Sequence, residues 1–241
     1  MKVLITGSTD GIGRATAEAL LDDGHEVIVH GRNKSRVATI DSLLDRGAAA
    51  VVGDLSDMDQ TRRLADQVNA LGRVDTVIHN AGVMVPESVL PVNVVAPYLL
   101  TALIERPQRL IYLSSSMHRH GRQELDQLDW DGRRETASYS DSKLFVTAMA
   151  LGIARRWPGV WVNSVDPGWV PTRMGGPEAA DDLHLGHLTQ VWLATAGNPD
   201  ACSSGGFWFH QQRREPCTAA SDVPFQDRLI EVLECHTGTV L

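Results

Sequence analysis

Thr6-Gly7-Ser8-Thr9-Asp10-Gly11-Ile12-Gly13 follows the apolar run Val3 to Ile5 and leads directly into the helical stretch Arg14 to Leu20. A helix that begins at a glycine loop offers free backbone N–H groups, and glycine lets an anion approach the backbone closely. The stretch therefore predicts a loop that binds a pyrophosphate through Gly7, Ser8, Thr9, Gly11, Ile12 and Gly13. An ordinary turn between a strand and a helix is the alternative.

Short apolar runs that suit buried parallel strands recur along the chain. They are Val3 to Ile5, Val27 to Val29, Ala49 to Val52, Val74 to Ile78, Leu110 to Leu113 and Val160 to Val165. Helical spacing separates several of them, at Ala15 to Leu21, Val37 to Leu44 and Leu64 to Leu71. This alternation predicts an α/β Rossmann fold, a doubly wound parallel sheet with helices on both faces. A late strand at Gly206 to Phe209 and a helix at Phe225 to Cys235 complete it, and residues 1–241 are expected to form a single domain.

Composition narrows the functional classes. The 22 Lys and Arg against 30 Asp and Glu give a net charge of −8, which disfavours nucleic-acid binding. Cys202, Cys217 and Cys235 form no CxxC pair, so we expect a reducing, cytoplasmic environment rather than a disulfide framework. There is no apolar stretch of membrane-spanning length and no charged leader, so we expect neither export nor a membrane. The pairs His118/His120 and His184/His187 lack a third local ligand, and we expect no metal.

The second strand is followed by His30-Gly31-Arg32-Asn33, without the carboxylate that NAD-binding folds place against the ribose 2′-hydroxyl. The fixed cation of Arg32, with Asn33 beside it, suits a 2′-phosphate and predicts NADP over NAD. Binding of NAD(H) stays open, because Asp10 disfavours an extra phosphate. A solvated surface arginine is the alternative for Arg32. We expect Asp54 and Leu55 to flank the adenine, although Asp54 could equally cap the next helix.

Tyr139-Ser140-Asp141-Ser142-Lys143 begins a helical segment and places its tyrosine and lysine on one helix face. A neighbouring ammonium favours the phenolate and is expected to lower the tyrosine pKa. This spacing is common by chance. It gains weight because Asn80-Ala81-Gly82, Ser114-Ser115-Ser116 and Asp166-Pro167-Gly168 all stand at strand carboxyl ends, where open α/β sheets bind ligands.

Together and in this order, these motifs resemble the short-chain dehydrogenase/reductase family from Thr6 to about Phe209. The resemblance implies that hydride passes between a nicotinamide and a carbonyl carbon while Tyr139 acts as general acid/base. It implies that Lys143 binds the nicotinamide ribose and lowers the tyrosine pKa, and that Ser115 holds the substrate oxygen. The backbone of Asn93 would anchor a water of the proton relay, with a buried structural amide as the alternative. The remaining cofactor contacts would be Asn80, Ala81, Gly82, Pro167, Gly168, Val170 and Thr172.

Two spacings depart from the family. Asn80 and Asn93 are closer together than in most relatives, so we expect the fourth helix to be largely missing. The usual dimer or tetramer then becomes doubtful, with a monomer as the alternative. Ser115 and Tyr139 are farther apart than in minimal members, and this gap, with Ser204 to Phe209, resembles the subgroup that is retinol-dehydrogenase-like and WW-domain-oxidoreductase-like.

Arg173 to Asp182 stands where the family carries a mobile flap over the substrate. We therefore expect an NADP(H)-dependent oxidoreductase that interconverts a carbonyl and an alcohol on a small to medium apolar substrate. The alternative is a catalytically silent protein of the same fold that senses the nicotinamide or serves as a scaffold. Trp169, Met174, Trp192 and Met84 are candidates for lining the pocket or for plain packing.

Overall fold

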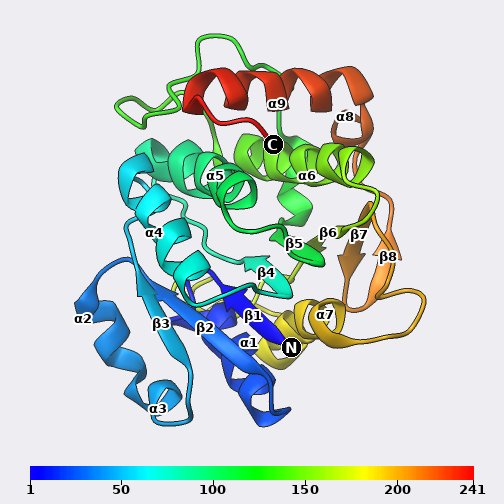
Figure 1. The fold of residues 1–241 in the computed structure, drawn as a ribbon. Coiled ribbons are helices and arrows are strands. Elements are labelled where there is room, and N and C mark those ends of the chain that lie inside the picture. The colour runs from blue at the N-terminus through cyan, green and yellow to red at the C-terminus, as the bar shows by residue number, and fades with distance from the viewer.

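A twisted sheet of eight strands runs through the middle of the molecule in the order β3-β2-β1-β4-β5-β6-β7-β8 (Figure 1). The computed structural model describes residues Met1–Leu241. The parallel strands are β1 (Lys2–Ile5), β2 (Glu26–Gly31), β3 (Ala49–Val52), β4 (Thr76–His79), β5 (Arg109–Leu113), β6 (Trp161–Asp166) and β7 (Gly206–Phe209). Only β8 (Gln212–Arg214) is antiparallel, and it pairs with β7. The predicted doubly wound Rossmann fold is confirmed.

The side chains of each central strand alternate between two apolar layers, as the two-residue period of a strand requires. Val3 and Ile5 face α1 (Gly11–Asp22) and α7 (Leu183–Thr195), whereas Leu4 faces the opposite layer. That layer holds α4 (Met58–Ala70), α5 (Ala96–Leu103) and α6 (Tyr139–Arg156). Both faces of the sheet are therefore buried, which explains why its strands are continuous apolar runs.

Helix α9 (Val223–Thr237) lies outside α6 and adds a further layer on that side (Figure 1). Gly152 permits this approach, because a Cβ atom there would lie 2.9 Å from Cδ1 of Ile230. The short helix α8 (Thr218–Ser221) precedes α9. No helix has both the length and the apolar character needed to cross a membrane.

Several local expectations need correction. The fourth crossover helix is present, because a π-helical turn (Pro91–Val95) runs into α5 and all its residues are buried. The shortening falls instead on the irregular segment after Asn80. The stretch Val37 to Leu44 is broken into α2 (Lys34–Val37), a 3-10 turn (Ala38–Ile40) and α3 (Asp41–Leu44). Strand β8 and helices α7 and α8 were not predicted.

Candidate active site

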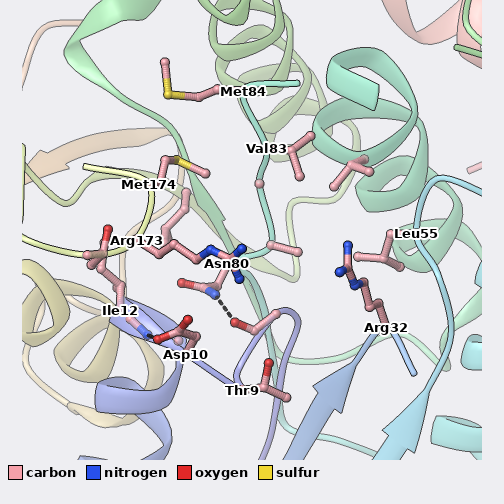
Figure 2. Close-up of a pocket in the computed structure, with 18 of the residues that line it drawn as sticks. Thr9, Asp10, Ile12, Arg32, Leu55, Asn80, Val83, Met84, Arg173 and Met174 are labelled. Atoms are coloured by element: carbon pink, nitrogen blue, oxygen red, sulfur yellow. Dashed lines mark hydrogen bonds between the residues drawn. The ribbon is translucent and has the colours of Figure 1, made fainter. Parts of the chain in front are cut away.

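An open cavity of about 870 Å³ lies at the carboxyl ends of the strands (Figure 2). Strand β1 pairs with β2 on one side and β4 on the other, so the chain reverses its direction of winding here. The crossovers on the two sides then lie on opposite faces and leave a crevice, which is the usual ligand site of such sheets. The glycine loop, the ends of β2 and β4, the start of α6 and the flap all contribute to its lining.

Buried side chains hold the glycine loop in place. The Nδ1 atom of His30 accepts a hydrogen bond from the Gly7 N–H at 2.9 Å, and its Nε2 lies 2.8 Å from the Gly53 carbonyl, to which it donates. Ser8 Oγ donates to the Ile5 carbonyl and accepts from the His30 N–H. Burial lowers the pKa of His30, so the neutral imidazole required by these bonds is the stable form. This role of His30 could not be predicted, because it depends on contacts with Gly7 and Gly53, which are distant in sequence.

The segment Asn80-Ala81-Gly82 packs directly on the loop. Asn80 Nδ2 donates to the carbonyls of Thr6 and Gly7 at 2.8 and 3.0 Å. At Gly13 a Cβ atom would lie 2.3 Å from that Nδ2, so only glycine fits this position. Five of the six predicted phosphate-loop residues line the cavity: Gly7, Thr9, Gly11, Ile12 and Gly13. Asn80, Ala81 and Gly82 line it as well. Ser8 is fully buried behind them.

Two arginines lie at the end of the cavity beside β2. Arg32 lines the cavity and forms no ion pair, and its guanidinium points into the open space (Figure 2). Arg36 of α2 also lines it, and its guanidinium lies 3.5 Å from Oδ2 of Asp10. The sequence analysis missed Arg36 because it is four residues beyond Arg32, on a turn of helix that was not predicted to start there.

Asn33 and Asp54 take different places from those expected. Asn33 caps α2 by accepting from the Arg36 N–H at 2.9 Å, and it does not line the cavity. Asp54 and Leu55 do line it. The cap of α4 is Asp57, whose Oδ1 accepts from the Gln60 N–H, so the capping alternative for Asp54 is wrong.

A capping box starts α6 and fixes where its tyrosine and lysine lie. Ser138 Oγ accepts from the Asp141 N–H, while the Asp141 carboxylate accepts from the Ser138 N–H. Tyr139 is thus the first helical residue, and Lys143 follows one turn later. Both line the cavity. The geometry brings a phenol and an ammonium together beside the glycine loop.

The pKa values of Tyr139 and Lys143 differ from the sequence prediction. The Lys143 ammonium donates to the Leu113 carbonyl at 2.7 Å and lies 5.3 Å from the centre of the Tyr139 ring. Burial lowers the pKa of Lys143 to about 8. Burial, and then the carboxylate of Asp166, raise the pKa of Tyr139 to about 12. The expected lowering of the tyrosine pKa is therefore not seen, because desolvation of the phenolate outweighs the attraction of an ammonium that is bonded elsewhere.

The serines after β5 divide between two roles. Ser114 lines the cavity, but its hydroxyl lies 2.6 Å from that of Thr147 within the core. Ser115 caps the 3-10 turn Ser116–His120 by accepting from the Met117 N–H at 3.2 Å. Beneath it, the fully buried His118 donates from Nδ1 to the Ser115 carbonyl at 2.7 Å and accepts at Nε2 from the Cys217 N–H. Sequence reasoning missed this anchoring role of His118.

Asn93 joins the segment after β4 to α6. Its Oδ1 accepts from the Val83 N–H at 2.8 Å, and its Nδ2 donates to the Val83 carbonyl and to Ser142 Oγ, each at 3.0 Å. The side chain is thus the buried structural amide that was left as an alternative. Its place in the π-helical turn leaves the role of its backbone a prediction.

The flap, which is the segment from Pro167 to Asp182, forms the side of the cavity next to β6. Pro167, Thr172, Arg173 and Met174 line it, and Met84 faces them from the segment after β4 (Figure 2). Gly168 and Val170 do not line it. Val170 packs instead against Gly186, where a Cβ atom would lie 2.8 Å from Cγ1 of Val170. Trp192 is remote from the cavity and packs on Trp208.

Comparison with known proteins identifies the family. The family model described as short chain dehydrogenase matches residues 1–104. Short-chain dehydrogenase chyC of Penicillium rubens is 34% identical over 255 residues, which cover 100% of this chain and 98% of that protein. The chain belongs to the short-chain dehydrogenase family. Within it, human retinol dehydrogenase 13 is 33% identical over 198 residues, 72% of this chain and 60% of that protein, in keeping with the subgroup resemblance.

Among solved structures, a blue fluorescent protein from a metagenomic library, in complex with NADPH, has the same fold. Its TM-score is 0.70 at 23% identity, covering 87% of this chain and 94% of that one. As a short-chain dehydrogenase, the chain is an oxidoreductase.

Proposed function

We propose that this short-chain dehydrogenase is an NADP(H)-dependent oxidoreductase that interconverts a carbonyl and an alcohol on a small to medium apolar substrate. One observation carries the proposal. Tyr139 and Lys143, one turn apart on α6, line the same cavity as the glycine loop and Arg32, which has no ion pair. A proton donor, an ammonium and two sites for phosphate thus share one space.

The residues present fit a nicotinamide dinucleotide. The glycine loop lies at the N-terminus of α1, and its shape is already set by His30 and Asn80. Arg32, with Arg36 behind it, offers cationic groups for a 2′-phosphate, while Asp54 and Leu55 would flank the adenine. Lys143 would bind the nicotinamide ribose. The NADPH in the related structure supports this choice of cofactor. When bound, the cofactor supplies or accepts a hydride.

The acidity of Tyr139 suits proton donation. With its pKa raised to about 12, the phenol keeps its proton at neutral pH and can give it to a carbonyl oxygen as reduction occurs. Ser115 does not line the cavity, and its Oγ accepts from the Met117 N–H, so its contact with the substrate oxygen rests on the family resemblance alone. The protonated phenol of Tyr139 supports the reduction of a carbonyl.

Apolar side chains at the mouth of the cavity support an apolar substrate. Val83, Met84, Val85 and Met174 line it, and Met84 is 52% exposed. Exposed apolar groups of this size usually mark a binding surface when they gather at one place. We infer that the substrate covers them when it binds.

Tyr139→Phe tests the chemistry. NADPH oxidation is followed by absorbance with a panel of aldehydes and ketones, and the variant is expected to lose nearly all turnover. Its affinity for NADPH, measured by calorimetry, should stay unchanged because the phenol hydroxyl forms no hydrogen bond in this structure. A wild-type protein that binds NADPH but reduces nothing in the panel would instead match the sensor or scaffold alternative.

Arg32→Ala tests the cofactor preference. Loss of a charged hydrogen bond should raise the Kd for NADPH by roughly ten- to hundredfold and leave the Kd for NADH nearly unchanged. Lys34→Ala, an exposed cation two residues away on α2, is the matched control. Equal losses for both cofactors would contradict a 2′-phosphate contact.

A further inference from the structure

The guanidinium of Arg173 enters the cavity from the flap without a protein partner. Its side chain extends from the flap towards Asn80, in the middle of the cavity (Figure 2). Arg36 differs, since its charge is offset by Asp10 at 3.5 Å. Arg173 is exposed, and its guanidinium faces the open cavity without an ion pair, so it is available to an anionic ligand.

The backbone that carries Arg173 is held over the start of α1. The methyl group of Thr172 lies 3.1 Å from the position that a Cβ atom would take at Gly11, the first residue of that helix. A closed turn surrounds Arg173, because the Gly176 N–H donates to the Thr172 carbonyl at 2.9 Å and the Gly175 N–H donates to Thr172 Oγ1 at 3.2 Å. The arginine therefore projects from a tethered point beside the N–H groups of the glycine loop.

The charge of the cavity runs against that of the whole chain. The chain carries −8, yet the cavity is lined by the cations Arg32, Arg36, Arg173 and Lys143 against the two carboxylates of Asp10 and Asp54. The two arginines without an ion pair, Arg32 and Arg173, lie in separate parts of it (Figure 2). A ligand with two separate anionic groups matches this arrangement.

We propose that Arg173 binds the pyrophosphate of the dinucleotide from the flap side, facing the N–H groups at the start of α1. This inference rests on the proposed function. The planar fork of a guanidinium matches two phosphate oxygens at once. From the other side α1 offers the N–H groups that follow Gly11, because the Gly11 N–H itself donates to Oδ1 of the capping Asp10 at 2.8 Å. Arg173 is thus a cofactor-binding residue that holds the flap against the pyrophosphate.

Arg173→Met tests the inference by calorimetry, without turnover. The Kd values for NADPH and NADH should both rise by roughly ten- to hundredfold, since both contain the pyrophosphate. The Kd for 2′-AMP, which lacks it, should not change. Arg63→Met, an exposed arginine on α4 outside the cavity, is the matched control and should leave all three values unchanged. Thermal midpoints of both variants should match the wild type, since Arg173 has no partner to lose.

Different results separate the two proposals. If the wild type binds NADPH and Arg173→Met binds it equally well, the inference fails and the proposed function stands. A loss confined to NADPH would place Arg173 on the 2′-phosphate and overturn the inference. An unchanged cofactor Kd with a raised KM for carboxylate-bearing substrates would also overturn it. A wild type that binds neither dinucleotide would overturn both proposals.

Discussion

Lys143 should set the alkaline limit of carbonyl reduction. Its pKa is lowered to about 8 by burial, whereas that of Tyr139 is raised to about 12, so the ammonium loses its proton first as pH rises. If reduction needs the ammonium, kcat/KM for NADPH should fall about fifteenfold between pH 8 and 9.5, and above that by about tenfold per pH unit. This parameter reports the ionisations of the free enzyme.

Lys143→Arg tests whether the ionisation of Lys143 causes the fall of kcat/KM at high pH. A guanidinium stays charged throughout this range, so the variant should keep whatever activity it has up to about pH 10. The assay is initial-rate NADPH oxidation at saturating aldehyde across pH 6 to 11. Lys34→Arg, an exposed lysine on α2, is the matched control and should keep the wild-type profile. A decline near pH 8 that survives in Lys143→Arg would refute the reasoning.

The lowered pKa of Lys143 also predicts that the free energy of unfolding depends on pH. The folded state holds the Lys143 proton less tightly than the unfolded chain, where the pKa is 10.5. Unfolded chains therefore bind more protons between pH 8 and 10, and the free energy of unfolding should rise with pH by up to about 1.4 kcal/mol per unit. Urea unfolding of Lys143→Met should lack this contribution.

Three further predictions concern the surroundings of the site. Burial lowers the pKa of His79 from 6.5 to about 3, so the folded state excludes a proton that the unfolded chain takes up below pH 6.5. The free energy of unfolding should therefore fall by about 2 kcal/mol by pH 5 because of this group. Urea titrations of His79→Gln should lack this loss. Gly13→Ala should abolish NADPH binding in calorimetry, because its Cβ would lie 2.5 Å from the Gly7 carbonyl oxygen, while its far-ultraviolet circular dichroism spectrum stays unchanged. The control Gly159→Ala, whose Cβ would have no neighbour within 4 Å, should bind NADPH normally. Asn93→Ala leaves the part-buried N–H and carbonyl groups of Val83 without their side-chain partners and should lower the free energy of unfolding by about 1–3 kcal/mol in total, which thermal melts would detect.

Strand positions could be predicted well because each parallel strand is a short apolar run between polar turns. Ala49–Val52 and Gly206–Phe209 coincide with their predicted bounds. The glycine loop, Tyr139 and Lys143 could also be placed, since their spacing alone brings them to one sheet edge. Apolar runs and motif spacings of this kind are local in sequence, and they suffice to predict the fold and the central residues of the site.

Features that depend on tertiary contacts could not be predicted. Helix α7 is buried on most sides and so lacks a clear amphipathic period, and its Gly186 and Thr189 are weak helix formers. The direction in which the Tyr139 pKa moves depends on burial and on Asp166, which is far away in sequence. Arg36 reaches the cavity only because α2 begins at Lys34, under the cap of Asn33.

The side chains that hold the glycine loop have a consequence for binding thermodynamics. His30, Ser8 and Asn80 already fix the backbone that would meet a phosphate, so little conformational entropy is lost there when a ligand arrives. Between Pro167 and Asp182 the flap is held by turns and a few hydrogen bonds, without a helix or strand. Most of the ordering cost of complex formation, and with it the rate at which the complex comes apart, should therefore be governed by the flap.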